Sequence, residues 1–323
     1  MPAQTSMENL FSYFPPKLAE ALRRLSLQNQ LALKEIRLHA ASPVLLYFGH
    51  CTRLLQQNGQ VAVQPNAQTV TLTQPELENV FQALCRYSVH SFEEEITHGF
   101  LTIEGGHRVG LFGTAVLENG RITAFKDYSS LNIRVAREVR GAADNFFETV
   151  LHHRLQSVLL IGAPATGKTT LLRDAVRGIS SGRLGRFYKV AVVDERGELS
   201  AMHHGIPQND LGPCTDIYHL CPKAMGMEMA IRAGSPELLV CDEIGAEDDI
   251  HLLLQSMFAG VKILTTAHAG SLEELSRRGQ FARLLEEQVF DKIVLLQNQG
   301  IPGVIQHIWN REEVSPCISS RLY

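Results

Sequence analysis

Long apolar runs are missing from this chain of 323 residues, and so are dense blocks of lysine and arginine. No stretch approaches the ~18–20 consecutive apolar residues that a membrane-spanning helix needs. The opening MPAQTSMENLFSYF lacks the basic start and the apolar centre of a secretory signal peptide. The net charge is only −4, and without a basic tail we expect no dedicated nucleic-acid binding.

Cysteine is scarce as well. Six cysteines without dense framework spacing are typical of reduced thiols, so we expect a cytoplasmic protein. Cys214 and Cys221, with His219 between them, do not have the spacing of a zinc site. A content of 45% hydrophobic and 20% charged residues is typical of a folded globular protein, and the length is sufficient for two domains.

The stretch GAPATGKTT directly follows the apolar run 157–161 and directly precedes a helical pattern. It matches G-x-x-x-x-G-K-[ST], a loop whose glycines allow backbone N–H groups to turn toward phosphate oxygens. The helix that follows adds its positive N-terminal end. Lys168 would neutralise the β- and γ-phosphates, and the Thr169 hydroxyl would hold Mg²⁺. The predicted ATP-binding residues here are Gly162, Ala163, Pro164, Ala165, Thr166, Gly167, Lys168, Thr169 and Thr170.

Apolar runs alternate with helical stretches from about residue 145 onward. This alternation predicts an α/β fold with a mostly parallel, doubly wound sheet. The expected strands are 189–194, 238–242, 262–267, 292–296 and 303–308. Residues 1–140 contain no phosphate motif and predict a separate, smaller α+β domain. We therefore expect domains over 1–140 and 141–323, with the boundary near Gly141.

The expected first domain combines short helices with strands. Thr73 and Glu76 form a capping-box pattern for a helix that runs to about residue 87. Asn119-Gly120 predicts a tight hairpin turn between strands 114–117 and 121–125. The other expected elements are helices over 15–25 and 91–97 and strands over 35–39, 44–48, 100–104 and 107–113.

Three arginines follow this hairpin. Arg134, Arg137 and Arg140 are three residues apart, so they share one face if segment 131–140 is helical. One interpretation is a solvated basic face. The other is that these arginines bridge the two domains and contact the nucleotide phosphates, which makes Arg134 a candidate nucleotide-binding residue.

Asp242 and Glu243 end the expected strand 238–242, at the edge where open α/β sheets bind ligands. In nucleotidases of this type the aspartate holds Mg²⁺ and the adjacent carboxylate polarises the attacking water. Glu243 therefore favours hydrolysis over the phosphorylation of a small molecule. The alternative is that the acidic pair only caps the next helix.

Two further strand ends carry polar residues. Asp194 and Glu195 could hold a metal-bound or hydrolytic water, or they could belong to a solvated turn. His268 follows strand 262–267 and is a candidate sensor of the γ-phosphate, although a lone histidine is more often structural. The candidate catalytic residues are thus Glu243, Glu195 and His268, and the candidate Mg²⁺ ligands are Thr169, Asp242 and Asp194.

Several stretches together resemble the stage III sporulation protein AA family of ATPases, which are related to the ATPases of type II/IV secretion and pilus retraction. In the expected first domain the resemblance rests on SFEEEITHGFLTIEGGHRVGLFG and SSLNIRVAREVRGAAD. In the second it rests on GAPATGKTTLLRD, VVDERGEL, CPKAMGM, AIRAGSPELLVCDEIG and AGVKILTTAHAGSLEEL. It covers nearly the whole chain.

The resemblance implies a RecA-like P-loop ATPase core in a homo-oligomer, a ring of about six subunits with nucleotide between neighbours. It also implies a motor that energises a channel between mother cell and forespore during sporulation. Its partners would then be membrane proteins of that channel, and it would lie at the inner face of the membrane. The family's acidic box looks like Asp194-Glu195, and its histidine box looks like His268.

The chain departs from the family pattern at two positions. Cys214 and Ala246 stand where the family pattern has arginine. If either arginine normally reaches a neighbour's γ-phosphate, that role falls to Arg232, Arg196 or Arg134. Loss of an arginine finger costs ~10³-fold or more in rate.

Two other functions stay open. The first is a nucleic-acid-dependent ATPase, although the sequence after Asn310 offers no room for the single-strand-binding domain found in relatives with this core. The second is a nucleotide-gated adaptor that binds ATP with little turnover, which the two missing arginines favour.

Overall fold

The computed structural model of the protein describes residues 3–297 and 301–314. The chain divides into two compact units. The first extends to Glu138 and also contains Ala201–Gln208, and the second contains the rest of the chain. The predicted domains, 1–140 and 141–323, assigned Ala201–Gln208 to the second domain. In the structure this segment belongs to the first unit.

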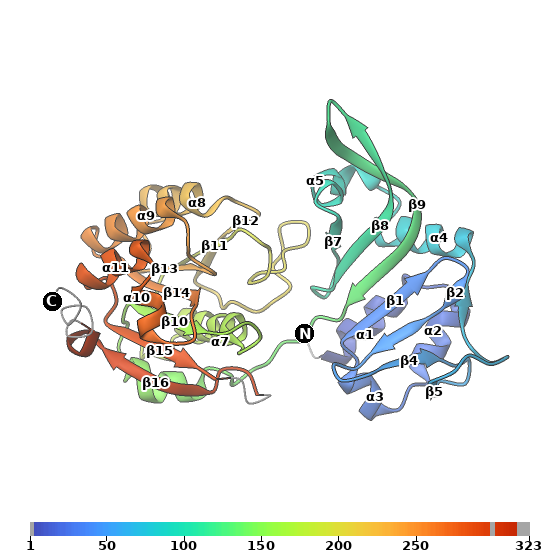
Figure 1. Cartoon of the computed structure of the whole chain (residues 1–323), viewed down its shortest axis with the longest axis horizontal. Helices are drawn as coiled ribbons and strands as arrows, with labels where there is room; N and C mark the ends of the chain where they lie inside the picture. Colours follow the sequence, from blue (N-terminus) through green and yellow to red (C-terminus); the bar gives the residue numbers. More distant parts are fainter. Residues whose placement is uncertain (1–2, 298–300, 315–323) are drawn as a thin grey trace. The chain divides into compact units, whose positions relative to one another are not determined.

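The first unit is built on an antiparallel sheet in the order β5-β4-β3-β1-β9-β8-β7. Figure 1 shows β8 and β9 side by side as a long hairpin that extends beyond the other strands. The strands of this sheet are β1 Glu35–His39, β3 Leu45–Tyr47, β4 Thr52–Leu55, β5 Val61–Ala62, β7 Phe100–Thr102, β8 Arg108–Glu118 and β9 Arg121–Arg134, and a separate pair is formed by β2 Ser42–Pro43 and β6 Thr71–Leu72.

Helices share one core with this sheet, because the apolar residues of both fall in a single buried cluster. The capping box predicted at Thr73 and Glu76 is present at the start of α4 and satisfies its first backbone N–H groups. The helices are α1 Ala3–Phe11, α2 Pro16–Arg23, α3 Leu27–Ala32, α4 Gln74–Leu84 and α5 Glu93–Thr97, preceded by the 3₁₀ turn η1 Val89–Phe92.

The segment 131–140 is not helical, so the three arginines do not share a helix face. Residues 130–134 belong to β9, where they pair with β1 on one side and β8 on the other. Beyond them, the N–H of Val135 donates to the carbonyl of Lys34, and the Arg137 guanidinium donates to the carbonyl of Leu33 at 3.0 Å. The backbone N–H of Val135 and the Arg137 side chain thus both have tertiary partners, which override the local preference for a helix.

The second unit contains a sheet in the order β12-β11-β13-β14-β10-β15-β16. All neighbours in it are parallel except β15 and β16, which are antiparallel. Its strands are β10 Val158–Gly162, β11 Val190–Asp194, β12 Thr215–His219, β13 Leu238–Cys241, β14 Lys262–His268, β15 Lys292–Leu296 and β16 Ile305–Asn310. The edge strand β12 was not predicted, since its residues lack the continuous apolar character of the central strands.

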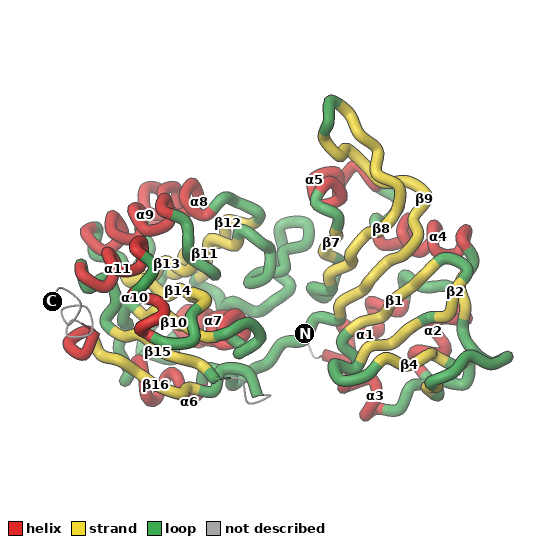
Figure 2. Tube along the Cα trace, viewed as in Figure 1, coloured by secondary structure: helices red, strands yellow, loops and turns green. Residues whose placement is uncertain are grey.

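Helices cover both faces of this sheet (Figure 2). Alternate residues of β10 enter two different buried clusters, Leu159 and Ile161 into one and Val158 and Leu160 into the other. The elements on the two faces are α8 Lys223–Met229, η3 Ala230–Gly234, α9 Glu247–Phe258, α10 Leu272–Ser276 and α11 Gly279–Glu286 with the first cluster, and α6 Asp144–Phe146, η2 Phe147–Leu151 and α7 Lys168–Ser180 with the second. The predicted α/β class with a mostly parallel, doubly wound sheet is confirmed.

None of the helices in the described ranges is both long enough and apolar enough to cross a membrane.

The long hairpin depends on one glycine. The β8–β9 register shifts between Phe112 and Thr114, where Asp127 adopts a left-handed φ of 49°. A Cβ on Gly113 would lie 2.8 Å from the carbonyl oxygen of Lys126, which is backbone and cannot move aside easily.

We therefore predict that Gly113→Ala destabilises the first unit by ~1–3 kcal/mol through overpacking. Gly279→Ala is the matched control, because no atom lies within 4 Å of its added Cβ. Urea unfolding, followed by circular dichroism, measures the free energy of unfolding of both variants. Equal stabilities of the two variants would contradict the conclusion that the β8–β9 register shift requires glycine at position 113.

Candidate active site

The phosphate-loop sequence forms a sharp turn between β10 and α7. Ala165 and Gly167 both have left-handed backbone, with φ of 63° and 88°. A Cβ on Gly162 would lie 2.8 Å from Thr166 Oγ1, and one on Gly167 would lie 2.6 Å from Pro302 Cα. Glycine is therefore required at position 167, where φ is left-handed and the close atom is backbone, and left-handed residues in such a loop turn N–H groups into a concave anion-binding nest.

Strand register brings distant residues to this loop. Gly162, at the end of β10, pairs with His268 at the end of β14, and Cys241 of β13 pairs with Thr265 of β14. The carboxyl ends of β10, β14 and β13 therefore lie next to one another, which is where open α/β sheets bind ligands. The residues that follow β13, Asp242 and Glu243, lie at this edge.

The side chains of Asp242 and Thr169 are in direct contact. Thr169 Oγ1 donates to Asp242 Oδ2 at 2.6 Å, and the Thr266 hydroxyl donates to Asp242 Oδ1. A hydroxyl and a carboxylate in direct contact are oxygen ligands of the kind that Mg²⁺ prefers. Both residues fit the predicted metal site.

Lys168, His268 and Glu243 form a chain of contacts. Lys168 Nζ lies 3.2 Å from His268 Nδ1, and His268 Nε2 lies 2.9 Å from Glu243 Oε1. Because an ammonium group only donates, Nδ1 accepts and Nε2 carries the proton. Lys168 Nζ also donates to the carbonyls of Gly162 at 2.8 Å and Ala163 at 2.9 Å. Burial lowers the pKa of Lys168, while Asp242 and Glu243 act in the opposite direction.

The arginines that were candidates for a phosphate contact lie in different places. Arg196 forms an ion pair with Glu243 in the same chain. Arg232 is 78% exposed and pairs with Glu228 at 2.7 Å. Arg134 lies in β9 of the first unit, so its nucleotide contact stays a prediction.

The adjacent acids of the acidic box have different environments. Asp194 is buried, and its carboxylate accepts from the Leu199 N–H at 3.1 Å and from the Ser200 N–H and hydroxyl at 2.7 and 2.6 Å. Burial raises the pKa of Asp194, but His219, Ser200 and Leu199 outweigh it and hold that pKa below its usual 3.8. Asp194 therefore closes the turn after β11, and its role as a Mg²⁺ ligand stays a prediction.

Lys223 was not among the predicted residues, yet it connects three parts of the site. Its Nζ donates to the carbonyl of Glu243 at 2.6 Å and lies 3.4 Å from Glu195 Oε2 and 3.7 Å from Asp249 Oδ2. Its backbone N–H donates to Glu195 Oε1 at 3.1 Å. Glu243 has a left-handed φ of 52°, so Lys223 holds a strained backbone. Its place at the start of α8, where a cation is unfavourable, was the available signal.

Comparison with known proteins identifies the family. The family model described as "Sporulation stage III, protein AA" matches residues 8–315. The chain belongs to this family. The stage III sporulation protein AA of Bacillus subtilis (strain 168) is 35% identical over 307 residues, which are 95% of this chain and 96% of the relative. The resemblance noted from the sequence motifs is thereby confirmed.

Solved structures share the fold of this family member. The ATPase DotB of Legionella pneumophila matches 90% of this chain and 83% of its own, with a TM-score of 0.55 and 16% identity. The pilus retraction motor PilT with bound ADP matches 91% of this chain and 85% of its own, with a TM-score of 0.60 and 13% identity. At these identities the likeness shows a common fold.

The site makes one prediction about pH. Because the pKa of Asp194 is lower in the folded protein than in the unfolded chain, its charged form stabilises the fold above the unfolded pKa of about 3.9. That contribution is lost as the pH falls through the folded pKa. Asp194→Asn should lose ~1–3 kcal/mol at pH 7, and its deficit should shrink below about pH 4.

Urea unfolding at a series of pH values measures this deficit. Asp248→Asn is the control, since Asp248 is exposed in the first turn of α9. A deficit for Asp194→Asn that did not change with pH would show that charge plays no part in closing the turn.

Proposed function

We propose that this chain is an ATPase that hydrolyses ATP to ADP and phosphate. The observation that carries the proposal is the chain of contacts from Lys168 through His268 to Glu243, beside the contact of Thr169 with Asp242. This chain of contacts connects the Lys168 ammonium group, which can bind phosphate, to the Glu243 carboxylate, which can polarise water.

The loop residues fit a triphosphate with Mg²⁺. The left-handed backbone at Ala165 and Gly167 and the N-terminus of α7 favour phosphate oxygens. Thr169 and Asp242 would hold Mg²⁺, which supplies positive charge near the phosphates when bound. Lys168 would exchange the carbonyls of Gly162 and Ala163 for phosphate oxygens. His268 would then report the change to Glu243, the general base, and Glu195 would assist through Lys223.

The hydrolysis would drive mechanical work. Membership of the sporulation family and a fold shared with a pilus retraction motor support a motor that energises a channel between mother cell and forespore. We propose a ring of about six copies, cytoplasmic and held at the inner face of the membrane by membrane proteins of the channel.

One observation favours the alternative of an adaptor with little turnover. Both carboxylate oxygens of Glu243 already have a partner, Arg196 on Oε2 and His268 on Oε1, so a water molecule polarised by Glu243 would share or replace one of these contacts. Cys214 and Ala246 also stand where the family pattern has arginine. In a ring, release of Glu243 by Arg196 would let Arg196 contact a neighbour's phosphate and would start hydrolysis.

We predict that Glu243→Gln lowers the rate of ATP hydrolysis by about 10²–10⁴-fold, the usual contribution of a general base. ATP binding should persist, because Lys168 and Thr169 are unchanged. Lys168→Ala, by contrast, should lose nucleotide binding. A phosphate-release assay and fluorescent-ATP titration measure both effects on protein sized with and without ATP.

Glu287→Gln, an exposed acid at the end of α11, is the control for Glu243→Gln. Normal hydrolysis by Glu243→Gln would reject its role as base. A parent protein with no turnover in a single-turnover assay of the assembled ring would favour the adaptor. Stimulation by RNA with a steep salt dependence would favour the nucleic-acid-dependent ATPase.

Lys223 gives a further prediction. Lys223→Met removes the cation that lies between Glu195, Asp249 and the carbonyl of Glu243. A misplacement of about 1 Å can cost about 10²-fold, so the rate at saturating ATP should fall by that order while the KM changes little. Lys223→Arg should recover part of the rate because it keeps the charge. A raised KM with an unchanged rate would contradict a positioning role.

A further inference from the structure

The long hairpin of the first unit has an unpaired edge. Strand β9 runs from Arg121 to Arg134, but β1 pairs with it only over Ser130–Arg134. On the other side, β8 pairs with β9 as far as the hairpin turn. Among the described residues no strand pairs with residues 121–127 along the edge that β1 occupies lower down. Such an edge presents backbone N–H and C=O groups to another strand.

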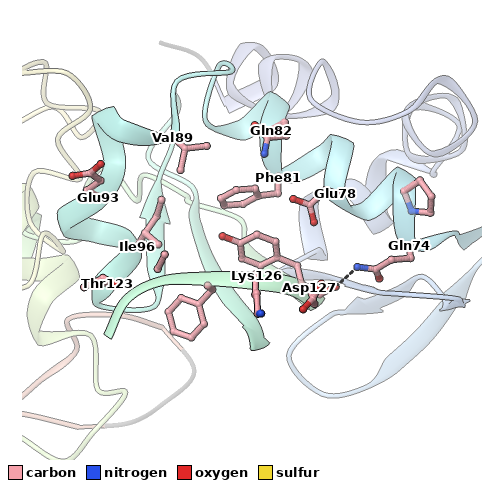
Figure 3. Close-up of a pocket in the computed structure, with 14 residues that line it drawn as sticks. Gln74, Glu78, Phe81, Gln82, Val89, Glu93, Ile96, Thr123, Lys126 and Asp127 are labelled. Carbon is pink, nitrogen blue, oxygen red and sulfur yellow. Dashed lines mark hydrogen bonds between the residues drawn. The ribbon is translucent and has the colours of Figure 1, made fainter. Parts of the chain in front are cut away.

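A groove lies alongside this free edge. It is a cavity of about 660 Å³ lined by residues 123–128 of β9 together with side chains of α4, η1 and α5. Figure 3 shows Phe81, Val89 and Ile96 turned toward it. Phe81 packs against the ring of Tyr128 with centroids 4.0 Å apart. The groove thus offers an apolar floor beside an unpaired strand.

The charges around the groove are mostly negative. Its lining includes three carboxylates, Glu78, Glu93 and Asp127, and one ammonium group, that of Lys126. In Figure 3, Glu93 lies toward one end of the groove, and Glu78 and Asp127 lie toward the other. A binding partner with basic side chains would match this distribution.

Exposed apolar side chains continue from the groove along the hairpin. Leu117 and Ile122 face each other across the two strands and are 63% and 39% exposed. Exposed apolar residues that gather on one element mark an interaction surface. The register shift at Gly113 and the left-handed Asp127 lie where the free edge begins, and bulges commonly end strand pairing.

We propose that residues 121–127 of β9 bind an extended segment of a partner protein that presents apolar side chains on one face, with a basic residue beside them on the same face. The segment adds to the sheet as a strand, its apolar side chains enter the groove over Phe81 and Tyr128, and the basic side chain on the same face meets Glu78 and Asp127. Strand addition supplies affinity through main-chain hydrogen bonds and specificity through pockets for alternate side chains. This interaction does not depend on ATP hydrolysis.

Fluorescence anisotropy with the full chain tests the proposal. The probe is a fluorescein-labelled short peptide in which Val, Phe and Leu occupy alternate positions, Lys takes the next position on the same face, and Ser stands between them. One counterpart has Glu for every Lys, a second has Ser for every apolar residue, and a third has Pro at alternate positions so that it cannot pair as a strand. The first peptide should bind about tenfold or more tightly than each counterpart, a difference of 1.4 kcal/mol or more.

Two tryptophan variants place the site. Ala124→Trp fills the groove and should weaken binding about tenfold or more, whereas Gln255→Trp, at an exposed position of α9 in the second unit, should leave it unchanged. Circular dichroism checks that both variants are folded. Hydrogen exchange should show that the peptide protects amides of residues 121–127. Non-specific electrostatic attraction of a basic peptide would not cause this protection.

Three results would overturn the proposal. Equal binding of the serine counterpart would mean non-specific attraction to a chain of net charge −4. Binding without protection of residues 121–127 would reject strand addition. Concentration-dependent self-association that Ala124→Trp abolishes, without peptide binding, would make a second copy of this chain the occupant.

Discussion

The candidate active site depends on the parallel alignment of three neighbouring strands, β13, β14 and β10. Because their carboxyl ends meet at one edge of the sheet, Glu243, His268 and Lys168 come within hydrogen-bonding distance although they are far apart along the chain. A shift of one residue in the β14 register would turn His268 to the other face of the sheet. The buried apolar residues on both faces of the sheet prevent that shift.

The features that could be predicted from the sequence are those set by local chemistry. The phosphate loop, the capping box of α4 and the strands of the second unit all rest on residues that are neighbours in the chain. The fold class followed from them. The segment 131–140 could not be predicted in this way, because Arg137 and Val135 find their partners around residues 33–34.

The sequence predicted which strand ends carry the candidate site residues, but it did not predict the contacts among those residues. Asp194 and Glu195 are adjacent in sequence, but one is buried and accepts from a turn while the other reaches Lys223. The sequence alone does not distinguish the two carboxylates, because Asp194 ends β11 while Glu195 belongs to the turn that follows, and only the folded chain brings Lys223 to it. Lys223 was missed for the same reason. Its importance comes from three elements that meet only in the folded chain.

The segment Ala201–Gln208 has a consequence for where this chain can be divided. His203 of this segment is buried in the first unit and lies 3.1 Å from the carbonyl of Thr102, and Gln208 accepts from the N–H of Gly105 at 2.8 Å. The chain therefore leaves the second unit and returns to it between the turn held by Asp194 and strand β12. A fragment that ends at Glu138 would therefore lack two of the first unit's own hydrogen-bonding residues, His203 and Gln208.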